Sequence, residues 1–104
     1  MDEIESERLV GPVIRGFDGE MIEAVIGAAE IDNPGQAISV EDRGGYVRVH
    51  APDRLRLTRA TMEQLLGRPF PLSELEPSLA AFAGHIQQGD DELTWSLKTE
   101  VVAP

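Results

Sequence analysis

The side chains that could act in catalysis are few in this chain and lie far apart in the sequence. The histidines are His50 and His85, and neither belongs to a spacing that metal ligands use. Ser39 could join them in one active site, because a nucleophile and its base often come together across a fold. A small enzyme with such a scattered site is therefore one hypothesis, and it predicts activity of the chain on its own.

Two pairs of adjacent carboxylates, Glu41-Asp42 and Asp90-Asp91, are weak candidates for acid–base or metal chemistry. Neighbouring side chains on an extended strand point to opposite faces, so the members of a pair do not readily share a proton or a metal ion. We interpret these residues as solvated charges in turns. The adjacent glycines Gly44-Gly45 lack the spacing of a phosphate-binding loop and predict a hairpin turn instead.

The chain contains no cysteine, which excludes disulfides, thiolate metal sites and iron–sulfur clusters held by cysteine. No motif predicts a haem, flavin or iron site. The residues therefore favour a domain with no cofactor and no metal that is not an enzyme. A generic regulatory domain that binds a small molecule in an internal cavity is a further alternative.

The net charge of the chain limits its partners. Among 104 residues, 19 are acidic and 9 are basic, which gives a formal net charge of −10. Such a surface repels nucleic acid and anionic membranes, so it favours a basic protein face or serves solubility. No apolar run approaches the roughly 20 residues of a membrane span, and the acidic N-terminus lacks the apolar stretch of a signal peptide. We therefore expect a cytoplasmic protein.

The first third of the chain predicts a strand, a helix and an abrupt corner. Residues 9–15 have the pattern of a strand, in which Pro12 predicts either an edge position or an irregularity. Asp18 is placed to cap the following helix. The apolar stripe of that helix comprises Met21, Ile22, Val25, Ile26 and Ala29. The helix pattern stops at Asn33-Pro34-Gly35, three residues that each fix a backbone geometry, and strand alternation begins at once.

Three short strands are expected after this corner. They lie at residues 37–40, 46–49 and 55–57. In the second strand, Val47 and Val49 share one face, and Tyr46 and Arg48 share the other. The segment Ala51-Pro52-Asp53 predicts a break between the second and third strands.

Two further helices and a hairpin complete the pattern. Thr58 predicts the start of a helix that ends at Gly67, and Ser73-Glu74-Leu75-Glu76 is the capping box of another. The buried side of this last helix is expected to comprise Leu75, Leu79 and Phe82. A hairpin is expected to turn at Gly89-Asp90-Asp91, with Trp95 as a core residue on its second strand.

These elements predict the α+β class: a compact single domain of mixed strands with about three short helices. The domain is expected to span residues 9–99, between a flexible acidic tail at residues 1–8 and a frayed C-terminus at residues 100–104. At this length, burying roughly two-thirds of the unfolded surface in one core is feasible.

Several short segments, in the same order and at matching spacing, make the chain resemble one protein family. They are Val10-Gly11-Pro12-Val13-Ile14-Arg15, Ala29-Glu30-Ile31-Asp32-Asn33-Pro34-Gly35, Val40-Glu41-Asp42-Arg43, Tyr46-Val47-Arg48, Leu57-Thr58-Arg59, Leu66-Gly67-Arg68-Pro69-Phe70, Glu74-Leu75-Glu76 and Phe82-Ala83-Gly84. The chain resembles the effector (coupling) proteins of soluble di-iron multicomponent monooxygenases, that is, the methane/phenol monooxygenase regulatory family. The resemblance extends from Val10 to about Lys98 and is greatest to the toluene 4-monooxygenase-like branch.

The resemblance implies a compact α/β fold without a cofactor and a role that is not enzymatic. It also implies a partner, the hydroxylase that holds a carboxylate-bridged di-iron centre. Effectors of this family dock above that centre and tune its active-site conformation, oxygen activation and coupling. Electrons reach the hydroxylase from an NADH reductase, in this branch through a Rieske ferredoxin. We expect the free effector to be a monomer.

The residues expected to contact the hydroxylase lie in three stretches, within or close to the matching segments. They are Asn33, Pro34, Gly35, Arg68, Pro69, Phe70, Ser78, Phe82, Gly84 and Gln87. For Phe82, burial in the core is the alternative, and for the proline and glycine positions it is turn geometry. The chain departs from the family pattern at Gly44-Gly45, at Pro71-Leu72-Ser73 and from Leu93 to Leu97, which leaves a toluene-, alkene- or isoprene-type substrate open.

Overall fold

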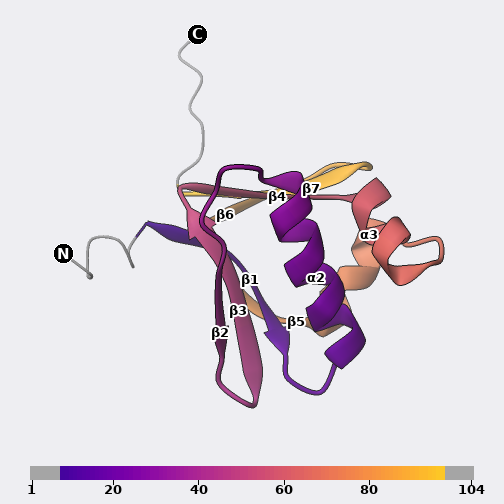
Figure 1. The fold of residues 1–104 in the computed structure, drawn as a ribbon, viewed down its shortest axis with the longest axis horizontal. Helices are drawn as coiled ribbons and strands as arrows, with labels where there is room; N and C mark the ends of the chain where they lie inside the picture. The colour runs from indigo at the N-terminus through magenta and orange to yellow at the C-terminus, as the bar shows by residue number, and fades with distance from the viewer. Residues whose placement is uncertain (1–7, 98–104) are drawn as a thin grey trace, which may run out of the picture.

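The structure is a computed structural model that describes residues 8–97 (Figure 1). In chain order, its elements are β1 (Leu9–Arg15), α2 (Gly19–Asp32), β2 (Ser39–Asp42), β3 (Tyr46–Pro52), β4 (Arg54–Thr58), α3 (Arg59–Leu66), the 3₁₀ helix η1 (Leu72–Ser78), β5 (Leu79–Ala83), β6 (His85–Gln88) and β7 (Glu92–Ser96). This architecture confirms the predicted α+β class. Apart from Arg8, the tails expected at residues 1–8 and 100–104 lie outside the described residues.

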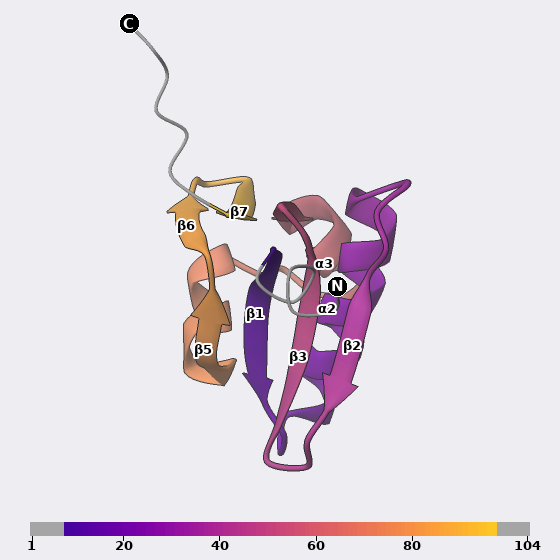
Figure 2. The same ribbon diagram turned by 90° about the vertical axis from the view of Figure 1, so that its left-hand side faces the viewer.

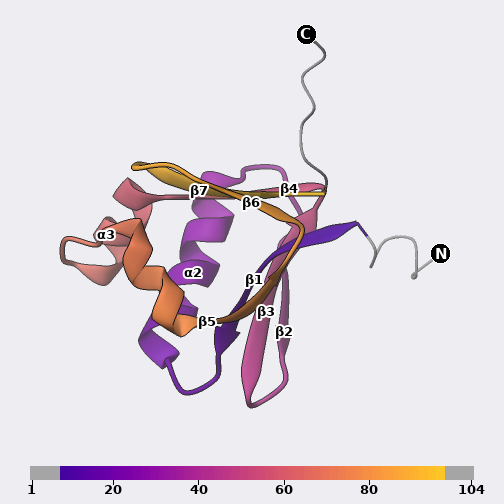
Figure 3. The same cartoon turned by 180° about the vertical axis from the view of Figure 1, so that it is seen from behind.

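The strands form two antiparallel sheets that meet at an angle. One sheet has the order β2-β3-β1-β5 and the other the order β4-β7-β6. The chain passes from the first sheet to the second through two one-residue corners, Asp53 and Gly84, whose φ angles are 67° and 95°. Helix α2 lies in the angle between the two sheets, and α3 lies beside it (Figures 1 and 3).

Strand β1 is an interior strand, so the edge position considered for Pro12 is wrong and the irregularity is confirmed. The register with β5 shifts between Val13 and Ile14, whereas the register with β3 is the same at Val10 and at Val13. Pro12 has no N–H to donate to a ladder. Its neighbour Gly11 has a φ of +143°, which a residue with a Cβ rarely adopts.

Both α-helices begin and end where their capping residues predicted. Asp18 accepts a hydrogen bond from the Met21 N–H at 3.3 Å, and Thr58 accepts one from the Thr61 N–H at 3.3 Å. At the end of α3, Gly67 adopts the left-handed conformation with a φ of 73°. The buried residues of α2 are Met21, Ala24, Val25, Ala28 and Ala29.

The third predicted helix is the largest error in the sequence analysis. No side-chain cap is present at its start, and the segment forms the short 3₁₀ helix η1, with Pro77 inside it. Leu79 and Phe82 belong to strand β5 instead, where Phe82 is 44% exposed. A 3₁₀ helix rarely continues beyond a few residues, so the chain turns into a strand that pairs with β1. The core position considered for Phe82 is therefore wrong.

The strand boundaries also differ from the prediction near the corners. Strand β3 continues through Pro52, and only Asp53 interrupts the path into β4. The Asp53 N–H donates to the Arg8 carbonyl at 2.8 Å, and the Asp53 carboxylate pairs with the Arg8 guanidinium. One left-handed residue thus replaces the longer break that was expected.

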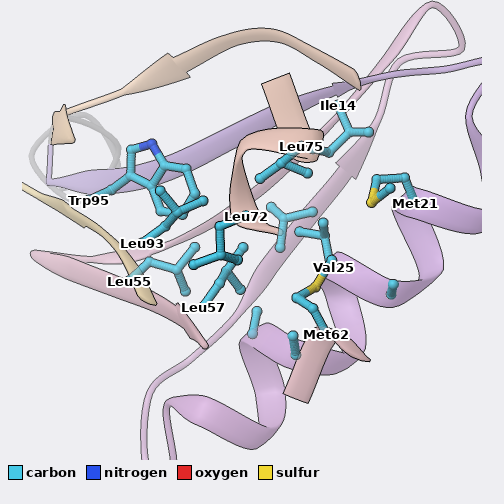
Figure 4. Packing of buried hydrophobic residues seen from close by; sticks show 14 of the residues in the cluster. Ile14, Met21, Val25, Leu55, Leu57, Met62, Leu72, Leu75, Leu93 and Trp95 are labelled. Carbon is cyan, nitrogen blue, oxygen red and sulfur yellow. The ribbon is translucent and has the colours of Figure 1, made fainter. Parts of the chain in front are cut away.

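The core lies between α2, the inner faces of the two sheets and η1 (Figure 4). Its largest fully buried side chains include Trp95, Phe70, Leu55 and Leu57. Trp95 is confirmed as a core residue, and the Leu93 side chain on the same strand is also buried. Burial of these apolar groups is the main source of stability in a chain without disulfides.

Candidate docking surface

The residues predicted to contact a partner do not lie on one surface. Asn33 follows the C-terminal end of α2, whereas Arg68 lies 3.6 Å from Glu20 at the N-terminal end of the same helix. A helix of 14 residues is roughly 20 Å long. Gly84 and Gln87 lie on the path from β5 into the other sheet. A contact surface that includes all three stretches must therefore extend around the molecule.

At the first stretch, the Asn33 side chain forms hydrogen bonds within the fold. Its amide group donates to the Ala29 carbonyl at 2.8 Å and to the Arg56 carbonyl at 2.7 Å. Its side-chain oxygen accepts from the Arg56 N–H at 3.0 Å. Asn33 thereby holds the end of α2 against β4, while Pro34 and Gly35 are exposed.

Asp32, which was not predicted as a functional residue, ties α2 to the start of α3. One oxygen of its carboxylate accepts from the Thr58 N–H at 2.8 Å and from the Thr58 hydroxyl at 3.0 Å. The other oxygen accepts from the Thr61 hydroxyl at 2.7 Å. Charge-assisted hydrogen bonds of this kind are stronger than neutral ones. The corner at Pro34 and Gly35 therefore starts from a helix end that is fixed at several points.

The second stretch, residues 68–70, is held by Glu63 on α3. The Glu63 carboxylate accepts from the Phe70 N–H at 2.8 Å and from the Arg59 guanidinium at 2.9 Å. These two hydrogen bonds, the Phe70 bond foremost, lower the pKa of Glu63. Arg68 and Pro69 are exposed, and the Phe70 side chain is completely buried.

The third stretch contains one buried residue and three exposed ones. Ser78 is buried, and its hydroxyl donates to the Asp18 carboxylate that also caps α2. Phe82, Gly84 and Gln87 are exposed. Since the side chains of Ser78 and Phe70 are both internal, neither is available to touch a partner, and we leave both out of the docking surface.

The outer face of the four-stranded sheet carries a groove of about 560 Å³. We call it the outer-face groove, and its lining residues are Leu9, Val13, Ser39, Glu41, Arg43, Arg48, His50, Ala81, Phe82 and Ala83. Of these, only Phe82 is among the residues predicted from the sequence to contact a partner. The alternation along β3 was the available signal, because Arg48 and His50 occupy the face opposite to the buried Val47 and Val49.

Glu41 is the charged centre of this groove. Its carboxylate accepts from the Arg48 guanidinium at 2.9 Å and also pairs with Arg43. These hydrogen bonds, with Arg48 the larger cause, lower the pKa of Glu41. The Arg48 guanidinium carbon also lies 5.3 Å from the centroid of the Tyr46 ring, which restricts its position.

His50 lies in the groove lining and is buried, and its Nε2 atom has no hydrogen-bond partner in the described part of the chain. Burial lowers the pKa of His50, and the positive charge of Arg48 lowers it further. A hydrogen bond to the Gly11 backbone and the charge of Glu41 oppose this shift in the pKa. The imidazole is therefore neutral near pH 7.

This shift predicts a specific pH dependence of stability. The unfolded chain binds a proton at His50 below about pH 6.5, whereas the folded chain does so only at lower pH. The free energy of unfolding should therefore be highest above pH 7. It should decrease as the pH falls from about 6.5 through the pKa of His50 in the folded chain. Three carboxylates have lowered pKa values: Glu41, Asp53 and Glu63. Their contribution to the free energy of unfolding is lost only below about pH 4.5.

Urea unfolding at pH 7.5, 6.0 and 5.0 measures this dependence. We expect the wild type to lose stability over this range and His50→Gln to lose much less, because glutamine does not titrate. His85→Gln is the matched control, since His85 is exposed on β6. Equal pH slopes for the wild type and His50→Gln would contradict the assignment.

The structure does not assemble the scattered catalytic site. Ser39 and His50 are cross-strand neighbours on β2 and β3, but His85 pairs with Ser96 in the other sheet. Within residues 8–97, no group of three or more histidine, aspartate or glutamate residues is arranged to hold a metal ion. In the same range, no helix is long and apolar enough to cross a membrane.

Comparison with known proteins establishes the family. The sequence profile of the MmoB/DmpM family matches residues 8–96, which is most of the chain. The chain belongs to this family. A similar protein is the effector subunit of the alkene monooxygenase system of Xanthobacter autotrophicus strain Py2, which is 46% identical over 93 residues, covering 89% of this chain and 90% of the relative.

Solved structures agree with the assignment to the MmoB/DmpM family. Two chains from structures of phenol hydroxylase–regulatory protein complexes match with TM-scores of 0.72 and 0.66 at 27% and 28% identity. The first match covers 85% of this chain and 97% of the other, and the second covers 84% and 99%. The soluble methane monooxygenase regulatory protein B shares the fold, with a TM-score of 0.65 at 20% identity, over 91% of this chain and 69% of that protein.

Proposed function

We propose that this chain is the effector component of a multicomponent monooxygenase and that it binds the di-iron hydroxylase of that system. The observation that carries the proposal is the 46% identity to an alkene monooxygenase effector subunit over nearly the whole of both chains. Two structural relatives come from complexes of a hydroxylase with its regulatory protein, which supports the same kind of partner for this chain. The hydroxylase is the enzyme, and this chain regulates it.

The effector acts through linkage between binding and conformation. A protein that binds one hydroxylase conformation more tightly than another shifts the population toward that conformation, by no more than the difference in binding free energy. A coupling of about 1–3 kcal/mol changes the ratio of the two states by roughly 5- to 150-fold. The effector tunes oxygen activation and coupling in this way without taking part in the chemistry itself.

Such a regulator needs a docking surface that keeps its shape, and two of the three stretches meet this need. Asp32 and Asn33 fix the corner that presents Pro34 and Gly35, and Glu63 fixes the loop that presents Arg68 and Pro69. Low mobility before binding reduces the entropic cost of docking. The proposed contacts are Pro34, Gly35, Arg68, Pro69, Phe82, Gly84 and Gln87, together with Asn33, which is half-buried rather than buried.

The rest of the system follows from the same proposal. Electrons reach the hydroxylase from an NADH reductase through a Rieske ferredoxin, and the effector carries none. The effector is a cytoplasmic monomer when free. The identity to an alkene monooxygenase effector favours an alkene as the hydrocarbon, and the substrate pocket lies on the hydroxylase.

Reconstitution tests the proposal. The hydroxylase encoded with this chain is combined with its reductase and ferredoxin, and alkene oxidation and oxygen consumption are followed as the effector is added. We expect product formation and the ratio of product to oxygen consumed to rise together. An unrelated acidic protein of similar size is the control for non-specific charge effects. Product formation by the effector alone would favour the enzyme hypothesis instead.

A further inference from the structure

The outer face of the four-stranded sheet is not covered by a helix in the described part of the chain. In Figure 2, strands β5, β1, β3 and β2 face the viewer, and α2 lies behind them. The buried face of the sheet packs on α2, whereas the opposite face carries the outer-face groove. A sheet face with a groove on the surface of a small protein is a place where a partner can bind.

The groove combines an apolar strip with a charged strip. Val13, Ala81 and Ala83 come from the neighbouring strands β1 and β5, and Phe82, which is 44% exposed, is also a lining residue. The charged strip comes from β2, β3 and the turn between them. This pattern suits a partner side chain that has an apolar stem and a polar end.

The charge of the groove is opposite to that of the whole chain. Its lining contains two arginines, Arg43 and Arg48, but only one carboxylate, Glu41. The chain as a whole has 19 acidic and 9 basic residues. Each guanidinium has five N–H donors, and the recorded bonds to Glu41 use one nitrogen of each arginine. The groove can therefore accept a further anionic group.

His50 is a second and independent sign of a missing binding partner. Buried polar atoms in native proteins are nearly always hydrogen-bonded, yet Nε2 of His50 is buried without a partner among the described residues. A carboxylate placed beside Arg48 stabilises the protonated imidazole, which then donates a hydrogen bond from Nε2. No charged residue of β1 or β5 is among the lining residues, so Glu41 is the sole carboxylate of the lining that competes for this position.

We propose that the outer-face groove receives a carboxylate side chain, a glutamate or aspartate, of the hydroxylase. The proposal rests on the proposed function, since it adds one specific contact to the binding of that partner. The apolar strip holds the stem of the side chain, and Arg43, Arg48 and His50 bind the carboxylate.

Substitution of Ala81 by side chains of similar length and opposite charge tests the proposal. Ala81 is exposed and lies in the groove lining, so Ala81→Glu and Ala81→Lys should both fold, and thermal unfolding checks this. Ala60 on α3 is exposed outside the groove, and Ala60→Glu and Ala60→Lys are the matched controls for overall charge. The affinity of each full-length variant for the hydroxylase is measured by titration of alkene oxidation.

We expect Ala81→Glu to bind at least about tenfold more weakly than Ala81→Lys, because two carboxylates brought together in one site repel each other. The corresponding pair at Ala60 should differ much less. Equal affinities for the two Ala81 variants, or weaker binding of the lysine variant, would overturn the proposal. If the wild type itself does not change the turnover of the hydroxylase, the proposed function fails, which is a separate outcome.

Discussion

Substitution of Gly11 by alanine is expected to lower the free energy of unfolding by about 3–5 kcal/mol, among the largest effects of any single change. A Cβ atom at this position would lie 2.2 Å from the Val49 carbonyl oxygen and 2.9 Å from Leu55. The first contact is with backbone, which cannot rotate away as a side chain can. The φ angle of +143° adds strain for any residue other than glycine.

Gly35→Ala is the matched control for Gly11→Ala. Gly35 also has a positive φ, of +86°, but a Cβ there has no atom within 4 Å. Its cost should therefore be only the backbone term of about 1 kcal/mol. Urea unfolding of both variants separates the effect of close packing from that of φ. A Gly11→Ala variant as stable as Gly35→Ala would show that β1 and β3 do not approach as closely as described.

Loss of the Asp32 carboxylate is also expected to lower the free energy of unfolding strongly. Asp32→Ala removes the acceptor for the Thr58 N–H, the Thr58 hydroxyl and the Thr61 hydroxyl. We expect a loss of about 3 kcal/mol, since hydrogen bonds to charged groups contribute about 1.5–3 kcal/mol each and are not additive. The start of α3 should become less protected, because its capping residue Thr58 loses its support.

Glu30→Ala controls for the loss of one negative charge from α2. Glu30 is exposed two residues before Asp32 on the same helix. Its replacement should change the free energy of unfolding by less than about 0.5 kcal/mol. Hydrogen exchange of the α3 amides shows where the stability is lost. If Asp32→Ala leaves these amides as protected as Glu30→Ala does, the link between α2 and α3 is not the one described.

Local signals in the sequence predicted the elements whose ends depend on nearby residues. Asp18, Thr58 and Gly67 act within one helical turn, so their roles could be inferred from spacing alone. The prediction of a third helix was wrong because the conformation of this segment depends on the pairing of β5 with β1, which is far away in the sequence. A capping-box sequence is present there, but tertiary pairing determines the conformation.

The same distinction explains the candidate contact residues. The corner at Asn33 was correctly located, yet its side chain turns inward because its partner Arg56 lies 23 residues further along the chain. Phe70 was equally impossible to place from its local sequence, because its burial depends on the packing of the whole core. The alternation along β3 did separate the residues of the outer-face groove from the buried ones. Nothing in this alternation showed which face of the sheet would stay uncovered.

If this chain regulates a hydroxylase by binding it, the rate of that hydroxylase depends on the effector concentration. The most direct measurement is the initial rate of alkene oxidation by the reconstituted hydroxylase, reductase and ferredoxin as a function of effector concentration. We expect a rate that rises and saturates near one effector per di-iron site, with no reaction when the effector replaces the hydroxylase. A rate and a coupling ratio that stay constant at every effector concentration would contradict it.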